Sequence, residues 1–279
     1  MKVFKISKDK NDIIKDLLKS CDFRFSELQY ADFQAKIKTC TITLYNSGKI
    51  VIAGKEEDIY ANILIEKGLI DIPKAPANCW FGVDEAGKGD LFGPLVVVSV
   101  LLSKELLPAA VDMGIKDSKS LKDDVISRVA YEIRKSFPFK TIVIMPEKYN
   151  ILYEKFGNLN TMLAWAHSKA AQEISNMGEP ELGIFDKFAH ENVLDKALFG
   201  KVKARIIQRT KAENDIAVAA ASIVARDEFI RRISQLSEQF NIDIPKGCSK
   251  TTMAFARELK KQKGPDIISK LCKEHFKFE

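Results

Sequence analysis

The sequence predicts an α/β protein in which a large domain built around a mixed sheet follows a small α+β domain. After residue 79, apolar runs of strand length alternate with helical segments, which is typical of α/β domains. Before residue 70, two β-rich runs flank Tyr45-Asn-Ser-Gly48, the strongest hairpin signal in the chain. Prolines and small polar residues at 71–78 interrupt the pattern. We therefore expect domains at 1–70 and 79–279, joined by a linker at 71–78.

The small domain is expected to contain a helix, an antiparallel sheet and a second helix. Its expected strands are Lys2–Ile6, Asp32–Lys38, Thr39–Leu44 and Lys49–Ala53, and its expected helices are Asn11–Cys21, capped by Asp9 or Asn11, and Glu56–Lys67. Gln34, Lys36 and Lys38 fall on one face of the second strand at period two. Such a face suits a phosphate backbone and equally suits a sheet face exposed to water, so both interpretations stay open.

The large domain is expected to alternate strands with helices. Its expected strands are Phe81–Val83, Leu95–Leu102, Lys140–Met145, Leu182–Phe185 and Val202–Ile207. Its expected helices are Lys122–Ser136, Thr161–Ser175, Ile216–Phe240, Thr251–Lys261 and Asp266–Lys273. The alanine-rich start of the helix at 216 predicts very close packing against a neighbouring element. The lysines between 260 and 277 are expected to form a solvated face.

Composition and charge argue against several classes of protein. The 279-residue chain carries a formal net charge of +6, which fits an anionic partner such as nucleic acid, although many cytosolic proteins are as basic. The five cysteines are scattered and form no C-x-x-C pair, which argues against a disulfide framework and a zinc site. We see no apolar leader and no apolar run of membrane length, so we expect a cytoplasmic protein without membrane contact.

The most informative stretch is Phe81-Gly-Val-Asp-Glu-Ala-Gly-Lys-Gly-Asp-Leu-Phe-Gly-Pro94, where a short strand meets a glycine-rich turn. Its adjacent carboxylates, Asp84 and Glu85, can act on a phosphate by holding divalent cations that activate a water. Adjacent strand residues point to opposite faces, so the two share a cation only if the chain bends there, which the glycines permit. The structural alternative is a strand end closed by an acidic turn.

Further carboxylates follow later in the chain. Asp186 ends an apolar run, at the strand edge where α/β proteins gather their ligand sites. The segment Thr210-Lys-Ala-Glu-Asn-Asp215 leads into the alanine-rich helix. Asn214 or Asp215 alone accounts for the cap of that helix, which leaves Glu213 for another role. Four carboxylates around two divalent cations would suit in-line hydrolysis of a phosphodiester.

The motif that begins at Asp84 resembles the signature of the type 2 ribonucleases H, the HII and HIII group of enzymes. The features that resemble the HIII members are Gly-Asp-Leu-Phe-Gly-Pro after the glycine turn, Ile115-Lys-Asp-Ser-Lys119, Glu147-Lys-Tyr-Asn150, Thr210-Lys-Ala-Glu213 and Ile244-Pro-Lys-Gly247. Motifs between Phe33 and Lys55 resemble the TBP-like substrate-binding domain of these members. The motifs recur in the same order over nearly the whole chain.

The resemblance implies a ribonuclease H-like fold and an endonuclease that cuts the RNA strand of an RNA–DNA hybrid duplex, using Mg²⁺ or Mn²⁺ as two divalent ions. The expected products carry a 3′-hydroxyl and a 5′-phosphate. The residues that match the catalytic and metal-binding acids by position are Asp84, Glu85, Asp186 and Glu213. Asn214 and Asp215 are near enough to Glu213 to take its place, so the fourth assignment stays open.

The resemblance also implies substrate contacts. Gly87-Lys88-Gly89 matches an element whose backbone reads ribose 2′-hydroxyls, the groups that separate RNA from DNA. Lys88 departs from the commoner arginine or threonine, and its side chain either contacts a phosphate or points into solvent. Lys119 is expected to contact a backbone phosphate, with Ser118 donating a hydrogen bond nearby. The alternative for this segment is an N-cap of the helix that follows.

Two rival functions remain at this stage, with the chain expected to be a monomer in each case. The chain could incise at a single ribonucleotide in DNA, as HII enzymes do, or could bind hybrids without catalysis. His167 is interpreted as a packed or surface residue rather than a ligand.

Overall fold

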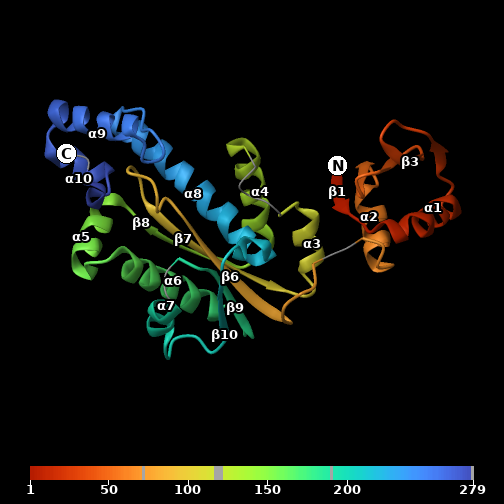
Figure 1. Cartoon of the computed structure of the whole chain (residues 1–279), viewed down its shortest axis with the longest axis horizontal. Coiled ribbons are helices and arrows are strands. Elements are labelled where there is room, and N and C mark those ends of the chain that lie inside the picture. Colours follow the sequence, from red (N-terminus) through yellow and green to blue (C-terminus); the bar gives the residue numbers. More distant parts are fainter. Residues whose placement is uncertain (71–72, 116–121, 189–190, 278–279) are drawn as a thin grey trace. The chain divides into compact units, whose positions relative to one another are not determined.

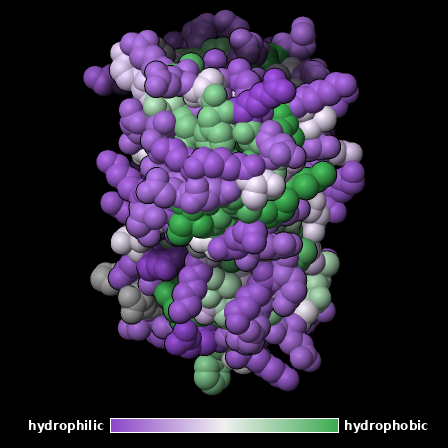
Figure 2. Space-filling view, turned by 90° about the vertical axis from the view of Figure 1, so that its right-hand side faces the viewer, coloured by the Kyte–Doolittle hydropathy of each residue, from purple (hydrophilic) through white to green (hydrophobic). Residues whose placement is uncertain are grey.

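The computed structural model describes residues 1–70, 73–115, 122–188 and 191–277, and the chain divides into two compact units (Figure 1). One unit contains Met1–Lys74 and Pro108–Gly114, and the other contains Ala75–Leu107 and Ile115–Glu279. Within the described ranges, no helix combines the length and the apolar character that membrane crossing requires. The face of the molecule drawn in Figure 2 is mainly hydrophilic, with smaller hydrophobic patches between.

A five-stranded antiparallel sheet in the order β1-β5-β4-β3-β2 organises the first unit. Its elements are β1 (Lys2–Lys5), α1 (Asn11–Ser20), β2 (Arg24–Ser26), β3 (Ala31–Lys36), β4 (Cys40–Tyr45), β5 (Lys49–Gly54) and α2 (Glu57–Glu66). Apolar residues of both helices and of the central strands are buried together, among them Ile14, Leu18, Ile42 and Leu64. The structure therefore confirms the predicted α+β unit with its hairpin and antiparallel sheet.

Three details of the first unit differ from the sequence predictions. Strand β3 ends at Lys36, because the chain turns back there and the Ile37 amide bonds the Cys40 carbonyl at 2.9 Å. Lys38 therefore lies beyond the strand that was expected to carry it. Neither Asp9 nor Asn11 caps α1, since a 3-10 turn runs directly into that helix. Strand β2 was not predicted.

A five-stranded mixed sheet in the order β10-β9-β6-β7-β8 organises the second unit. The strands are β6 (Cys79–Ala86), β7 (Leu95–Ser103), β8 (Phe139–Ile144), β9 (Leu182–Asp186) and β10 (Arg205–Arg209). Strands β6, β7 and β8 pair antiparallel, whereas β9 is parallel to both β6 and β10. The predicted mixed sheet is confirmed.

Helices cover both faces of this sheet. The helices of this unit include α4 (Asp123–Ser136), α5 (Pro146–Phe156), α6 (Leu159–Ser175), α7 (Glu191–Leu198), α8 (Ile216–Phe240), α9 (Lys250–Lys263) and α10 (Pro265–Leu271). Helix α8 runs along β6 and β7 on one face, and α6 covers the other (Figure 1). A further helix, α3 (Leu107–Asp112), follows β7 and groups mainly with the first unit.

The second unit departs from the predictions at several elements. Strand β10 starts at Arg205 rather than Val202, because its register is set by pairing with Leu182–Asp186 of β9. Helices α3, α5 and α7 were not predicted. Helix α10 was expected to reach Lys273, but it ends at Leu271. The Lys273 side chain is fully buried, whereas it was expected to be part of a solvated face.

Candidate active site

Helix α8 follows strand β6 closely because alternate residues of the strand fit its first turns. The Trp80 indole Nε1 donates to Asp215 Oδ1 at 3.2 Å, at the start of both elements. Two residues further along β6, a Cβ on Gly82 would lie only 2.2 Å from the backbone nitrogen of Val218. Two strand residues advance about 6.6 Å, while the three residues from Asp215 to Val218 advance about 4.5 Å and the next four about 6 Å, so strand and helix advance at a similar rate. The close packing that the alanines predicted is therefore present.

The first candidate acid, Asp84, also lies on the side of β6 that faces α8. Asp84 lies two residues beyond Gly82, and its carboxylate accepts a hydrogen bond from the Ser222 hydroxyl. The Glu85 amide also donates to Asp84 Oδ1, at 2.8 Å. Asp84 is thus held on the α8 face of the sheet. The sequence singled out Ser222 only as a packing residue and missed this contact.

Asp186 lies beside Asp84 on the neighbouring parallel strand. The register pairs Val83 of β6 with Phe185 of β9, so the two aspartates occupy the next positions and share the α8 face. Asp186 Oδ1 accepts a hydrogen bond of 3.1 Å from the Ala212 amide. The 3-10 turn Ala212–Asn214, which carries Glu213, therefore lies against the end of β9.

Glu85 points to the opposite face of the sheet. Strand β6 stays paired with β7 as far as Ala86, so the bend that would let the two carboxylates share a cation is not found. Glu85 Oε2 lies 3.0 Å from Nε2 of the buried His167 on α6, and its Oε1 lies 2.9 Å from Lys88 Nζ. His167 is packed, as expected, but it also contacts a candidate acid. Lys88 pairs with Glu85, whereas from the sequence its side chain was expected either to contact a phosphate or to point into solvent.

The two adjacent acids differ in electrostatic environment. Burial and the charge of Glu85 raise the pKa of Asp84 well above its usual range, although hydrogen bonds from Ser222 and the Glu85 amide oppose the rise. Burial also pushes the pKa of Glu85 upward, but His167 and Lys88 outweigh it and lower that pKa. The negative charge of Glu85 is compensated by the protein, whereas that of Asp84 is not.

This environment fits a cation on the α8 face. Hard carboxylate oxygens are the donors that Mg²⁺ and Mn²⁺ prefer, and a cation beside Asp84 would relieve its unfavourable charge. Asp84 and Asp186 could hold it. Over the ranges that the structure describes, no three acid, histidine or cysteine side chains already converge on one metal position.

The structure narrows the choice of a fourth acid. Asp215 caps α8: its Oδ1 accepts from the amides of Ala217 and Val218 at 2.9 and 3.3 Å and from Trp80. Burial raises the pKa of Asp215 despite these bonds. Asp215 therefore acts as the helix cap, which is one of the two roles that the sequence left open for it. Of the other two candidates for the fourth acid, Glu213 and Asn214, only Glu213 has a carboxylate side chain.

The glycines after β6 have different reasons to be glycine. Gly87 has φ of +84°, and a Cβ there would lie 2.2 Å from the Pro94 carbonyl oxygen and 2.8 Å from the Phe229 ring. Packing within the chain accounts for Gly87. Gly89 has open space around its Cβ position, so nothing in the described structure requires a glycine there. Among the turn residues, Gly89 best fits the predicted approach of a ligand to the backbone.

The other predicted contacts remain predictions. Ser118 and Lys119 lie outside the described residues. In the first unit, Gln34 donates to Thr43 Oγ1 at 3.1 Å and is half-buried, while Lys36 and Lys38 are exposed. Of the three residues predicted to contact a phosphate backbone here, the two lysines are therefore exposed.

Lys273 secures the segment that follows the glycine turn, and no sequence pattern indicates this contact. Its Nζ donates to the carbonyl oxygens of Asp90 and Phe92 at 2.8 and 3.4 Å and lies 5.6 Å from the centroid of the Tyr149 ring. Its own amide bonds the Leu91 carbonyl at 2.8 Å. Lysine-rich composition predicts exposure, and only the tertiary fold shows that this lysine is buried.

Replacing Lys273 by methionine should change how stability depends on pH. Burial lowers the pKa of Lys273 from 10.5 to about 7. Between these values the unfolded chain binds the proton and the folded chain does not. The free energy of unfolding of the unmodified protein should therefore rise relative to Lys273→Met as pH increases from 7 to 9, by at most about 1.4 kcal/mol per pH unit. Urea unfolding at both pH values measures the difference, with the exposed Lys270→Met as control. Parallel pH curves for the protein and Lys273→Met would contradict the prediction.

Comparisons with known proteins agree with this arrangement. Residues 81–279 match the family model for Ribonuclease HII, and residues 1–67 match a domain of unknown function (DUF3378). The chain is 42% identical to Ribonuclease HIII of Chlamydia pneumoniae, over 95% of this chain and 92% of that protein. It is 36% identical to Ribonuclease HIII of Protochlamydia amoebophila, over 95% of this chain and 90% of that protein.

Solved structures give the same result. A crystal structure of Bst-RNase HIII in complex with Mn²⁺ matches with a TM-score of 0.68 and 26% identity, covering 99% of this chain and 96% of that one. Aquifex aeolicus RNase H3 matches with a TM-score of 0.61 and 28% identity, covering 98% of this chain and 99% of that one. The chain therefore belongs to the ribonuclease HII family, and within it to the ribonuclease HIII enzymes.

Proposed function

We propose that this ribonuclease H hydrolyses the RNA strand of RNA–DNA hybrids with two divalent ions, Mg²⁺ or Mn²⁺, leaving a 3′-hydroxyl and a 5′-phosphate. The single observation that carries the proposal is the placement of Asp84 and Asp186 on neighbouring parallel strands of one sheet face. The Mn²⁺ complex of Bst-RNase HIII supports a divalent ion as the cofactor. We further propose a cytoplasmic monomer.

Each acid has a distinct part in the proposal. Asp84 and Asp186 would hold the ions, while Ser222 orients the Asp84 carboxylate through its hydrogen bond. Glu213 reaches the same edge from the turn that is bonded to Asp186 through Ala212. Bound divalent ions supply activation of the attacking water and stabilisation of the departing 3′-oxygen.

Glu85 needs a different account, because His167 and Lys88 hold it on the other face. We propose that Glu85 joins the metal site only by leaving one of these contacts, which its position near the end of β6 permits. Its second role is to fix Lys88, and with it the turn that carries Gly89. That turn would meet the ribose 2′-hydroxyl through backbone atoms, which are indifferent to base identity.

The first unit would bind the hybrid through the face of β3 that carries Gln34 and Lys36, together with Lys38 in the turn that follows the strand. Contacts to phosphate and ribose carry little sequence information, so cleavage should be largely independent of sequence and strongly sensitive to salt. The alternative that stays closest is HII-like incision at a single ribonucleotide. Membership of an enzyme family leaves little room for a protein that only binds hybrids.

Cleavage of three labelled duplexes in Mg²⁺ and in Mn²⁺ tests the proposal. The substrates are a full RNA–DNA hybrid, DNA with four consecutive ribonucleotides, and DNA with one ribonucleotide. We expect cutting of the first two and little cutting of the third, with 3′-hydroxyl products that a polymerase extends. Efficient cutting at the single ribonucleotide would favour the HII-like alternative, and no cutting with either ion would refute the proposal.

A further inference from the structure

A cavity of about 370 Å³ lies at the end of β6, next to the candidate acids. The glycine turn forms one side and helix α8 the other, and the residues around it are Glu85, Ala86, Gly87, Asp90, Asp123, Ser222, Arg226, Phe229, Ile230 and Lys246. All of them belong to the second unit. A space of this size takes a phosphate group and part of a sugar, not a duplex.

Two cations share one carboxylate in this cavity. Arg226 Nη2 lies 2.9 Å from Asp123 Oδ1, and Lys246 Nζ lies 2.7 Å from Asp123 Oδ2. The Arg226 and Lys246 side chains are 37% and 51% exposed, so a ligand can reach both. Asp123 balances only one of these two positive charges, and the other carboxylates around the cavity are already engaged, Glu85 by Lys88 and Asp90 by the Gly247 amide. The pair of cations can therefore accept one phosphodiester.

The position of Arg226 follows from the match between α8 and β6. Arg226 is four residues beyond Ser222, so it lies about 6 Å further along the helix axis. Ser222 contacts Asp84, and Arg226 therefore comes one step beyond the acids, beside Gly87 where the strand has ended. A phosphate at Arg226 would therefore lie on the glycine-turn side of Asp84, within the same cavity.

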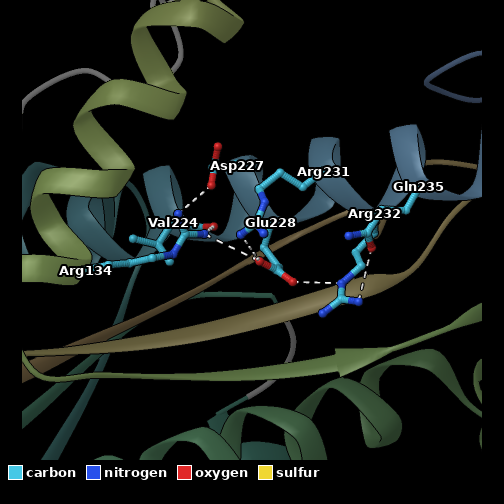
Figure 3. Close-up of polar contacts among 7 residues, drawn as sticks. All are labelled: Arg134, Val224, Asp227, Glu228, Arg231, Arg232 and Gln235. Carbon is cyan, nitrogen blue, oxygen red and sulfur yellow. Dashed lines mark hydrogen bonds and ion pairs between the residues drawn. The ribbon is translucent and has the colours of Figure 1, made fainter.

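The surrounding structure holds this group in place. Arg134 of α4 contacts Asp227 at 2.5 Å and Glu228 at 3.6 Å on α8, and Glu228 also binds Arg232 at 2.8 Å (Figure 3). This network fixes α4 against α8, and so keeps Asp123, the first residue of α4, next to Arg226.

The segment that carries Lys246 is held by a second set of hydrogen bonds. Asp90 Oδ1 accepts a hydrogen bond of 2.5 Å from the Gly247 amide, and the Leu91 amide bonds the Gly247 carbonyl at 3.1 Å. The segment that carries Lys246 is thereby joined to the loop after the glycine turn. Both cations therefore sit on backbone that is fixed relative to Gly87 and Asp84.

We propose that Arg226 and Lys246 form a subsite for one backbone phosphate of the cleaved strand, adjacent to the phosphate that is cut. This inference rests on the proposed function, because it requires a phosphodiester at Asp84. Asp123 keeps the two cations in position without substrate. A bound phosphate then takes over their charge, and the fork of the arginine grips two of its oxygens.

Binding measurements in EDTA test the subsite without any cleavage. Fluorescence anisotropy of a labelled RNA–DNA hybrid should give a Kd about tenfold or more higher for the double variant Arg226→Gln/Lys246→Gln. Its slope of log Kd against log salt should be smaller by about one unit, as expected for the loss of one phosphate contact. The matched control is Lys203→Gln/Arg205→Gln, which removes the same charges from exposed residues at the opposite end of the sheet and should change Kd less than twofold.

The variant Asp123→Asn separates a phosphate subsite from a structural bridge. It keeps both cations and removes their competitor, so hybrid affinity should stay equal or increase severalfold. If Asp123→Asn weakened binding as much as the double variant, or if both double variants had equal effects, the subsite would be refuted. Thermal unfolding of each variant identifies any loss of folding.

A neutral linkage locates the phosphate. A single methylphosphonate next to the scissile linkage should weaken binding by the unmodified protein several-fold and leave the double variant unaffected. Equal weakening in both proteins would overturn the assignment. If the unmodified protein shows the predicted binding pattern but cuts no duplex with Mg²⁺ or Mn²⁺, the proposed function fails, and Arg226 and Lys246 remain a phosphate-binding site that is not adjacent to a cleaved linkage.

Discussion

Replacing Asp84 by asparagine should lower kcat for hybrid cleavage by about a thousandfold or more, because a metal-holding charge worth about 4 kcal/mol of transition-state stabilisation is lost. Folding should not suffer. Burial and Glu85 raise the pKa of Asp84, so the folded protein binds a proton more tightly there than the unfolded chain does. Stability therefore falls as pH rises from the usual carboxyl pKa to the raised pKa of Asp84, and the full penalty remains above it, whereas asparagine removes that penalty. Single-turnover cleavage and thermal unfolding at pH 8 without metal measure the two effects.

Glu213→Gln and Asp215→Asn are the matched controls for this prediction. Glu213→Gln should lose activity by at least a hundredfold if Glu213 is the fourth acid. Asparagine is a good N-cap and keeps the acceptor for the α8 amides, so Asp215→Asn should retain activity close to that of the unmodified protein. A loss in Asp215→Asn with normal activity in Glu213→Gln would exchange the two assignments.

The sequence could predict where two of the acids lie on their elements because strand ends and caps are local features. Asp186 ends an apolar run and Asp215 precedes a helix, and both placements need only the pattern of neighbouring residues. The alanine-rich start of α8 likewise indicated close packing, which Gly82 on β6 makes possible. Local sequence carries this information because capping and close packing each require particular residue types.

Other features could not be predicted because they depend on partners far along the chain. Strand β6 extends through the two acids because β7 pairs with it as far as Ala86, although carboxylates and glycines favour a strand end. The contact of Glu85 with His167 requires knowing that α6 covers the face opposite α8. The burial of Lys273 depends on the return of the C-terminal segment to the loop after the glycine turn.

Replacing Gly82 by alanine should be among the most destabilising single changes in the second unit. The added Cβ would lie 2.2 Å from the Val218 nitrogen and 2.4 Å from the Ala217 carbonyl carbon. These are backbone atoms, so α8 itself must move away from β6. Overpacking of this kind costs about 3 kcal/mol, or more where backbone is displaced. Because α8 also carries Ser222, the shift should lower kcat together with stability. Urea unfolding and single-turnover cleavage at 15 °C, where the variant stays folded, measure both.

Gly89→Ala is the contrasting variant, since the same methyl group there meets open space. Its free energy of unfolding should stay within about 0.5 kcal/mol of the unmodified protein, as for surface changes that strain nothing. If the turn approaches a ribose, however, its KM for the hybrid should increase about tenfold. The two glycines then separate two causes: Gly82 lets a helix approach a strand, and Gly89 lets a substrate approach the backbone. A Gly82→Ala protein as stable as the unmodified one would contradict the first cause, and an unchanged KM in Gly89→Ala would contradict the second.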